Sequence, residues 1–207
     1  MVESLREKGF SDKRVLEAMD AVPRHLFLET MLDREAYKDM ALPINCGQTI
    51  SQPSTVAFQT ELLEVAEGMK VLEVGTGSGY QTAVLCAMGA KVFTIERQKE
   101  LFDETKKRIQ TLGIRGAKCF LGDGYKGLPE YGPFDRIIIT CGAPEVPSEL
   151  MKQLKAGGVM VIPVGGEHQE MIRIVKMGES EEEWLQQRYG DCKFVPMLEK
   201  LDYGRLS

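Results

Sequence analysis

The sequence predicts an α/β fold: a doubly wound, mostly parallel sheet flanked by helices, with an N-terminal helical elaboration and antiparallel C-terminal strands. Two observations lead to this fold class. Between residues 69 and 165, apolar bursts alternate with helical stretches, which is typical of parallel βαβ units with helices on both faces of the sheet. After two glycines at 165 and 166, two segments of strand character are joined by polar residues, which indicates an antiparallel edge.

The N-terminal part, residues 1–68, is expected to add helices and a loop to this sheet. Ser11 is a favourable N-cap for a helix over about 12–21, whose apolar residues follow helical spacing. Pro23 ends this helix. Residues 24–47 alternate short apolar and charged pieces, which predicts irregular structure with short turns packed on the main body.

A second helix is predicted from Pro53 to about residue 66, because proline suits the first turn of a helix. The central region 69–165 carries five predicted strands, at 71–74, 91–95, 117–121, 134–140 and 159–164. Helices are expected between them at about 79–89, 98–112 and 147–155. The C-terminal region, residues 166–207, contains the antiparallel segments MIRIVKM (171–177) and EWLQQRY (183–189). A chain of 207 residues is expected to form a single domain.

The composition argues against several classes of protein. The net charge of -5 arises from 26 basic and 31 acidic residues without a basic stripe, so we expect no nucleic-acid partner. No run of about 18 apolar residues occurs and the N-terminus is polar, so we expect no membrane span, no signal peptide and a cytoplasmic location. The five scattered cysteines contain no CxxC pair, so we expect reduced thiols and no metal. We also expect a monomer.

The glycine-rich stretch VLEVGTGSGYQ (71–81) places Gly75, Gly77 and Gly79 between the first central strand and the following helix. Glycine permits positive φ and a close approach of ligand to backbone, and a helix N-terminus offers free N–H groups. The spacing is GxGxG, whereas the dinucleotide fingerprint is GxGxxG. It therefore disfavours NAD and favours S-adenosylmethionine, although tight turns without a ligand also use glycine.

Three acidic residues are predicted near the same edge of the sheet, at the carboxyl ends of its parallel strands. Glu96 ends the second central strand, where a carboxylate can accept hydrogen bonds from ribose hydroxyls; otherwise it is an acid in the first turn of a helix. Asp123 follows the third strand and can accept a hydrogen bond from an adenine amino group or form an Asp-Gly turn. Glu73, within the first strand, is assigned to the sulfonium or ammonium of the cofactor. Together they predict a cofactor site at this edge.

Ahead of the glycine loop, the stretch GQTISQP (47–53) is uncharged and contains one large apolar side chain, Ile50. It can be a linker, or a loop that binds a substrate through hydroxyl and amide groups. Ser51 or Ser54 can also cap the helix that begins near Pro53. The residues alone leave the role of Ser51 open.

From PRHLF (23–27) to KFVPM (193–197), the sequence resembles protein-L-isoaspartate O-methyltransferases. The other matching segments are ALPINCGQTISQPS, VLEVGTGSGYQTAVL, GDGYKGLPEYGPFDRIIIT, APEVP and LKAGGVMVIPVG. The glycine loop is common to S-adenosylmethionine-dependent methyltransferases, whereas GQTISQP is specific to this family. The resemblance implies a Rossmann-like repair enzyme that methylates the free α-carboxylate of L-isoaspartyl residues, and less efficiently of D-aspartyl residues, in damaged proteins and peptides. The implied reaction leaves S-adenosylhomocysteine and a methyl ester that converts through succinimide to aspartate.

The resemblance also implies roles for single residues. Ser51 matches the active-site serine of the family. The residues assigned to the cofactor are Glu73, Gly75, Thr76, Gly77, Ser78, Gly79, Tyr80, Glu96, Arg97, Asp123, Gly124 and Thr140. Those assigned to the substrate are Thr49, Ile50, Ser51, Ser54 and Val195. Two positions depart from the family: Ser54 replaces an aromatic residue or histidine, and Cys141 replaces alanine.

The expected reaction needs no general base. Model carboxyl groups titrate near about 4, so the acceptor is already ionised at neutral pH. The site must then align the reacting atoms at roughly 3 Å and exclude water. A serine hydroxyl and backbone N–H groups can orient a carboxylate without protonating it, and a neutral loop avoids a lysine that would pair with the nucleophile.

Two other functions are alternatives to this one. A methyltransferase acting on a small molecule or on tRNA would share residues 71–140 but lack GQTISQP. A cofactor-binding module without catalysis, such as a metabolite sensor, would have no need of Ser51 beside the glycine loop.

Overall fold

The computed structural model describes residues 1–178 and 183–204 of the chain. In this part, a seven-stranded sheet has the strand order β5-β4-β3-β6-β7-β8-β9, and a small hairpin pairs β1 with β2. The hairpin strands are β1 (Leu42–Pro43) and β2 (Thr49–Ile50). The strands of the large sheet are β3 (Lys70–Val74), β4 (Lys91–Glu96), β5 (Ala117–Leu121), β6 (Phe134–Ile139), β7 (Leu154–Gly165), β8 (Gln169–Lys176) and β9 (Trp184–Cys192).

Strands β3 to β7 pair in parallel, and β8 and β9 continue the sheet in antiparallel pairs. This confirms the predicted mostly parallel sheet with an antiparallel C-terminal edge. Because β3 pairs with both β4 and β6, the strand order reverses between β3 and β6. Ligands of open α/β sheets bind at such a switch point, outside the carboxyl ends of the strands.

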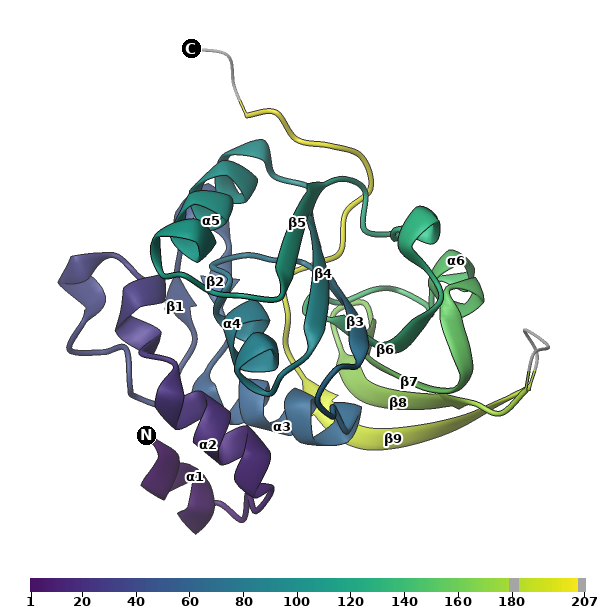
Figure 1. Cartoon of the computed structure of the whole chain (residues 1–207), viewed down its shortest axis with the longest axis horizontal. Coiled ribbons are helices and arrows are strands. Elements are labelled where there is room, and N and C mark those ends of the chain that lie inside the picture. Colours follow the sequence, from purple (N-terminus) through teal and green to yellow (C-terminus); the bar gives the residue numbers. More distant parts are fainter. Residues whose placement is uncertain (179–182, 205–207) are drawn as a thin grey trace.

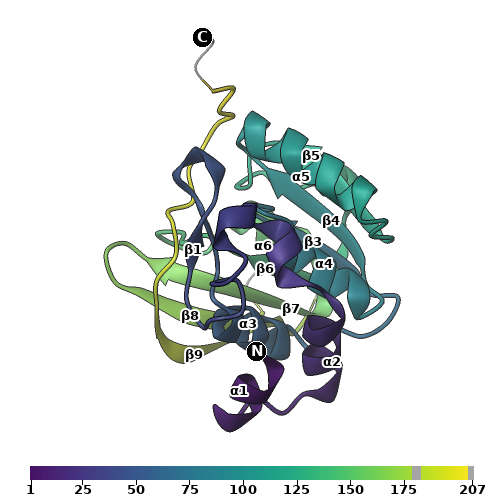
Figure 2. The ribbon, with the colours of Figure 1, turned by 90° about the vertical axis from the view of Figure 1, so that its left-hand side faces the viewer.

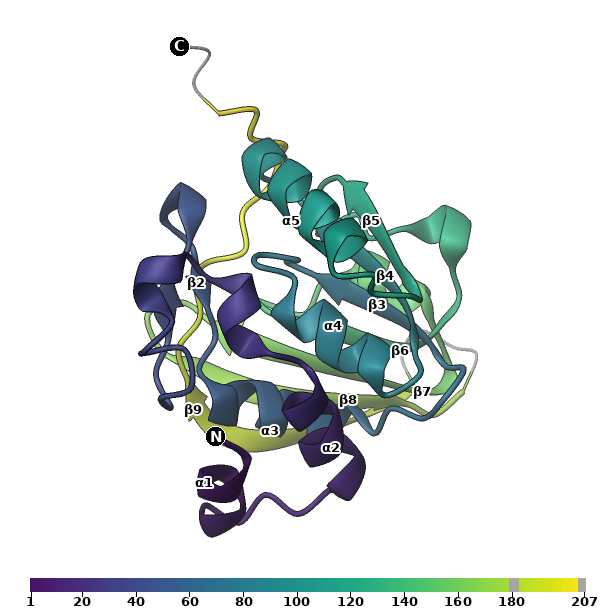
Figure 3. The same ribbon diagram turned by 60° about the vertical axis from the view of Figure 1, so that its left-hand side comes forward.

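Helices cover both faces of the sheet. In Figure 3, α3, α4 and α5 lie in front of it, and Figure 1 shows α6 on the opposite side. The α-helices are α1 (Val2–Glu7), α2 (Lys13–Ala21), α3 (Pro53–Leu63), α4 (Tyr80–Ala87), α5 (Lys99–Thr111) and α6 (Ser148–Lys152). Short 3-10 helices are η1 (Arg24–Phe27), η2 (Thr30–Leu32), η3 (Asn45–Gly47) and η4 (Pro129–Tyr131).

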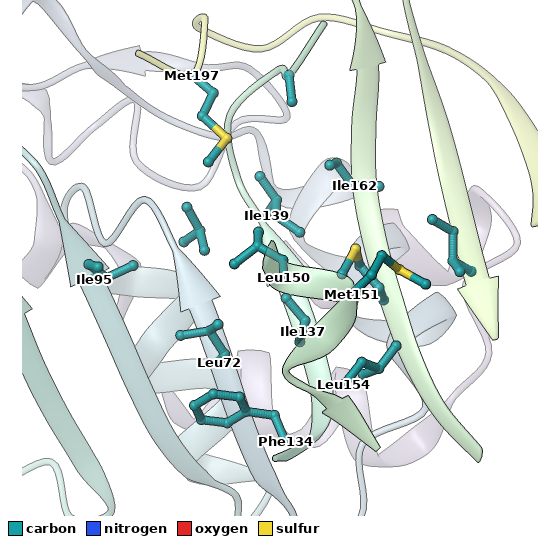
Figure 4. Packing of buried hydrophobic residues seen from close by; sticks show 14 of the residues in the cluster. Leu72, Ile95, Phe134, Ile137, Ile139, Leu150, Met151, Leu154, Ile162 and Met197 are labelled. Carbon is teal, nitrogen blue, oxygen red and sulfur yellow. The ribbon is translucent and has the colours of Figure 1, made fainter. Parts of the chain in front are cut away.

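Neighbouring residues of the central strands point to opposite faces and are buried on both. Leu72 and Ile137 pack with Leu150 of α6, in the cluster that Figure 4 shows. Val71, next to Leu72, packs instead with Leu63 of α3. Each fully buried aliphatic side chain of this kind contributes about 1.5–3 kcal/mol. The central strands therefore hold the carboxyl ends of β3 and β6 in fixed positions.

Two helix termini differ from the sequence prediction. The N-cap of α2 is Asp12 rather than Ser11, because the Asp12 carboxylate accepts the Arg14 N–H. The backbone N–H groups of Ser11 and Asp12 both donate to the Glu61 carboxylate. Helix α3 ends at Leu63 rather than near residue 66, since Glu64 adopts a left-handed conformation with φ 52°. The start of α2 therefore involves Glu61, which is distant in sequence.

Two further elements were not anticipated. Helix α1 was not predicted, and its Val2 and Leu5 are buried against α2 (Figure 2). Strand β7 begins at Leu154 instead of near residue 159, so α6 is shorter than predicted. The register between β6 and β7 shifts in this stretch, which contains two glycines that resemble a turn in the sequence. Among the described residues, no helix is long and apolar enough to cross a bilayer.

Candidate active site

A cleft opens at the carboxyl ends of β3, β4 and β6, at the switch point of the sheet. Its walls come from segments far apart in sequence: 48–51, 74–78, 95–98, 140–141 and 195–198. Figure 3 shows the C-terminal segment running from β9 past β2 toward α5. The fold thus brings the GQTISQP stretch and the glycine loop into one cleft.

The glycine loop follows β3 and is packed too tightly for side chains at two of its positions. Gly75 has a φ of 95°, and a Cβ there would lie 2.6 Å from the Thr140 Oγ1. Gly79 has a φ of 85°, and its Cβ would lie 2.7 Å from the Thr105 Cγ2. The Thr140 hydroxyl donates to the Gly75 carbonyl at 2.6 Å, and the Thr105 hydroxyl to the Gly77 carbonyl at 2.6 Å. Strand β6 and helix α5 therefore fix the loop's shape.

Glu96, at the end of β4, is the carboxylate that lines this cleft beside the loop. Its Oε2 accepts the Gly77 N–H at 3.0 Å and its Oε1 accepts the Gln98 N–H at 2.9 Å. The side chain is only 6% exposed. Each oxygen retains acceptor capacity, so Glu96 can receive hydrogen bonds from a diol while it stays tied to the loop.

Glu73 does not line the cleft, although the sequence assigned it to the cofactor. It is fully buried between β3 and α4, where its Oε2 accepts the Thr82 hydroxyl hydrogen. Its Oε1 has no hydrogen-bond partner among the described residues. Burial raises the pKa of Glu73 to about 7, and the hydrogen bond from Thr82 opposes that rise. The carboxyl group is therefore bonded to α4, the helix that follows the glycine loop.

Asp123 and Gly79 also lie outside the residues that line the cleft. The Asp123 carboxylate accepts the Tyr125 N–H at 3.0 Å and the Lys200 N–H at 3.4 Å. It therefore forms the Asp-Gly turn that the sequence offered as an alternative, and it holds the C-terminal segment. Gly124, the next residue, lines the cleft itself.

The GQTISQP stretch forms one side of a hairpin and is not a linker. Ile50 of β2 pairs with Leu42 of β1 and is buried, which anchors the stretch to the core. Ser51 follows and lines the cleft, and its hydroxyl has no hydrogen-bond partner within residues 1–178 and 183–204. Thr49 and Ile50 line the cleft as well.

Ser51 does not cap α3. The Ser54 N–H in the first turn of this helix donates to the Asp39 carboxylate at 2.8 Å. The Ser54 hydroxyl accepts the Gln52 side-chain N–H at 2.9 Å and lies outside the cleft lining. With the helix terminus satisfied by Asp39, the Ser51 hydroxyl is available to a ligand.

The remaining predicted residues line the cleft: Thr76, Ser78, Tyr80, Arg97, Thr140 and Val195. Several lining residues were missed by the sequence analysis: Gln48, Val56, Gln59, Gln81, Gln98, Pro196, Met197 and Leu198. Spacing gives a signal for two of them, since Val56 and Gln59 lie three residues apart on one face of α3. Pro196 and Met197 belong to the KFVPM segment that marked the family resemblance.

Cys141 brings a thiol into the cleft. Burial, followed by the nearby charge of Glu96, raises the pKa of Cys141 to about 12. The thiol is therefore uncharged at neutral pH, and the thiolate is the nucleophilic form.

These residues fit S-adenosylmethionine. Glu96 offers a fixed carboxylate for a ribose diol, and the closely packed loop at Gly75 leaves its backbone bare toward the cleft. Adjacent walls carry the uncharged side chains of Ser51 and Gln59. One cleft can therefore hold a nucleoside next to a polar, uncharged acceptor site.

Comparisons with known proteins agree with this arrangement. A sequence model of the family described as Protein-L-isoaspartate(D-aspartate) O-methyltransferase matches residues 1–202. A Protein-L-isoaspartate O-methyltransferase of Flavobacterium psychrophilum is 57% identical over 96% of this chain and 92% of its own length. One of Dictyoglomus thermophilum is 44% identical over 99% of this chain and 91% of its own.

Solved structures give the same result for the fold. A structure named protein-L-isoaspartate O-methyltransferase superimposes with a TM-score of 0.87 at 29% identity and covers 97% of this chain and 67% of that one. A putative protein-L-isoaspartate O-methyltransferase from Plasmodium falciparum, in complex with S-adenosyl-L-homocysteine, gives a TM-score of 0.83 at 27% identity. That match covers 95% of this chain and 96% of the other.

Proposed function

This chain belongs to the protein-L-isoaspartate(D-aspartate) O-methyltransferase family, and we propose that its cleft methylates the free α-carboxylate of L-isoaspartyl residues in damaged proteins and peptides. D-aspartyl residues are weaker substrates, S-adenosylmethionine is the methyl donor, and S-adenosylhomocysteine is the product. The methyl ester converts through a succinimide to aspartate, which repairs part of the damage. The observation that carries the proposal is the meeting of the glycine loop, Glu96 and the GQTISQP hairpin in one cleft.

In the cofactor half of the cleft, Glu96 would accept the ribose hydroxyls, because its carboxylate is held in place by Gly77 and Gln98. The backbone from Gly75 to Ser78 would surround the methionine part of the cofactor. Arg97, Gly124 and Thr140 complete this half. Glu73 would act indirectly, through α4, to which it is bonded at Thr82.

In the acceptor half, Ser51 would orient the substrate carboxylate with its hydroxyl, which has no partner among the residues that the structure describes. Thr49 and Ile50 on one side and Val195 on the other would contact the peptide around the isoaspartyl residue. The hairpin register and the burial of Ile50 keep Ser51 in position. Specificity for the acceptor is therefore assigned to the hairpin and the C-terminal segment.

S-Adenosylmethionine supplies an activated methyl group on its sulfonium. The residues of the chain then have to bind, orient and exclude water, since the acceptor carboxylate is ionised without a base. The uncharged Ser51 hydroxyl can orient that carboxylate without forming an ion pair. His25 bonds to Tyr37 and does not line the cleft, which agrees with a reaction that uses no histidine.

We further propose that the enzyme acts in the cytoplasm as a monomer, without a nucleic-acid or membrane partner. The five cysteines are all free, and thiols persist in reducing compartments. The net charge of -5 and the absence of a basic stripe in the sequence support the lack of a nucleic-acid partner. Sedimentation at micromolar concentration is expected to show a single 23.1 kDa species.

The test uses S-adenosylmethionine labelled in its methyl group and two peptides that differ only in an aspartyl or isoaspartyl linkage. Base-labile label is expected on the isoaspartyl peptide alone. Label on neither peptide, with transfer to a small molecule or to tRNA, would replace this function with another methyltransferase activity. Binding of the cofactor without transfer to any acceptor would indicate a sensor.

A further inference from the structure

The C-terminal strap, defined here as residues 194–198, belongs to no helix and to no strand of the sheet, and its residues 195–198 line the cleft. Two backbone hydrogen bonds to Gly142, in the segment after β6, set its position. The Gly142 N–H donates to the Val195 carbonyl at 2.8 Å, and the Met197 N–H donates to the Gly142 carbonyl at 2.7 Å. The strap therefore follows the sheet edge like a short added strand.

Gln169 provides a second attachment for the strap. Its Oε1 accepts the Phe194 N–H at 2.8 Å and its Nε2 donates to the Phe194 carbonyl at 3.1 Å. The side chain thus bonds both backbone groups of one residue, as a neighbouring strand would. Only 7% of Gln169 is exposed, and its amide is packed so closely that a Cβ on Gly142 would lie 2.2 Å from its Nε2.

The place of Gln169 in the chain explains why a side chain is needed there. It is the first residue of β8, and it pairs with Cys192 at the end of β9. The next backbone pairing of the chain joins Val195 to Gly142. Gln169 therefore spans the gap between two backbone-paired stretches, at the residue where the chain enters the cleft.

We propose that Gln169 is a positioning residue that fixes the strap and thereby sets the affinity for the isoaspartyl peptide without touching it. This inference rests on the proposed function, because it gives Val195 a role in peptide binding. Without the two bonds, Phe194 would lose both partners and the strap would have to order when the peptide binds. Such a cost weakens peptide binding, while Glu96 and the glycine loop, which hold the cofactor, stay in place.

The test is the variant Gln169→Leu, which keeps the size of the side chain and removes both bonds. The KM for an isoaspartyl peptide is expected to rise roughly tenfold, as the loss of two neutral hydrogen bonds predicts. Neither kcat nor the Kd for S-adenosylhomocysteine, measured by calorimetry, should change more than about twofold. The variant Gln169→Glu retains an acceptor for the Phe194 N–H and should give an intermediate KM.

Gln153→Leu is the matched control. Gln153 is a buried glutamine that likewise clamps a loop, since it accepts the Leu128 N–H at 2.7 Å and donates to the Lys126 carbonyl at 2.8 Å. Its replacement should lower the Tm as much as Gln169→Leu does, but leave the peptide KM at the wild-type value. Equal rises in KM for both variants would show a general structural effect and overturn the inference.

Hydrogen exchange separates this inference from the proposed function. In Gln169→Leu, the amides of Gly142 and Met197 should exchange faster than in the wild type, while those of β3 should be unchanged. If the wild type methylates no isoaspartyl peptide, the proposed function fails, and exchange still reports whether Gln169 orders the strap. An active wild type with an unchanged peptide KM in Gln169→Leu would refute the positioning role.

Discussion

The surroundings of Ser51 agree with the proposed role of its hydroxyl in orienting the acceptor carboxylate. Its hydroxyl lines the cleft and has no partner in the described part of the chain, because Asp39 satisfies the first turn of α3. A carboxylate acceptor is already ionised, so a hydroxyl can contribute orientation but does not need to remove a proton. Ser51 is thus expected to contribute to turnover without being an absolute requirement.

Replacing Ser51 with alanine is expected to lower kcat by roughly 10- to 100-fold, as the loss of one hydrogen bond to a charged group predicts. The Kd for S-adenosylhomocysteine should stay the same, since the cofactor half of the cleft is untouched. Initial rates with an isoaspartyl peptide and calorimetry with the product measure the two effects. Equal activity in the alanine variant would refute the role.

Glu73 shows how a buried acid links the site to pH. Burial raises its pKa to about 7, so the acid is partly protonated at neutral pH. Because the pKa in the folded chain lies above that in an unfolded chain, the protonated acid favours folding. This contribution is complete below the ordinary carboxyl pKa of 4.5 and is lost as the pH rises through about 7.

The variant Glu73→Gln is expected to remove this pH dependence. Relative to the wild type, its free energy of unfolding should improve by roughly 3 kcal/mol between pH 4.5 and pH 8. Urea unfolding of both proteins without ligand, at a series of pH values, measures the difference. A constant difference across that range would mean that Glu73 is ionised throughout and that its burial is offset by other groups.

At the scale of single elements, α3 depends on a residue from outside its own segment. Asp39 accepts the Ser54 N–H at 2.8 Å and also pairs with Lys8. Burial acts to raise the pKa of Asp39, but the hydrogen bonds from Lys8 and Ser54 outweigh burial and lower it. The carboxylate thus replaces the missing N-cap at Gln52 and attaches the start of α3 to the loop before β1.

Replacing Asp39 with alanine is expected to lower the free energy of unfolding by about 1 kcal/mol, as is typical for the loss of a helix cap. Because the pKa of Asp39 is lowered by folding, the loss should be present in full at pH 7 and should shrink as the pH falls from about 4 toward the lowered pKa of the folded chain. Thermal or urea unfolding at pH 7 and pH 3 measures both values. An equal loss at the two pH values would contradict the assignment to the ionised carboxylate.

For the whole molecule, stability is expected to be distributed across the sheet. β3 lies at the centre and is buried on both faces, whereas β9 is the terminal strand and most of its residues are exposed. Opening costs more where more apolar surface is buried. Local opening should therefore begin at the C-terminal edge of the sheet.

Hydrogen exchange followed by mass spectrometry is expected to find the slowest amides in β3 and β6. Those of β9 should exchange fastest among the strands of the sheet, because its outer edge has no neighbouring strand in the described chain and most of its residues are exposed. The other edge strand, β5, is less exposed. Protection of β9 equal to that of β3 would indicate that another copy pairs with this edge. Such a result would also contradict the proposed monomer.

The sequence by itself determined the fold class, the family and most of the cleft lining. Alternation of strands and helices between residues 70 and 165 is a local property, and so is the glycine spacing from Gly75 to Gly79. GQTISQP indicated the acceptor because it distinguishes one family within a large class. These features depend on neighbours in sequence, which a pattern can report.

Only the tertiary structure decided which side chains reach the cleft. Glu73 and Asp123 lie in segments predicted for the cofactor, yet Glu73 is bonded to α4 and Asp123 to a turn and the C-terminal segment. Gln169 gave no signal in the sequence, since its partner Phe194 lies 25 residues away. Packing against distant segments sets the direction of a side chain, and that information is absent from local spacing.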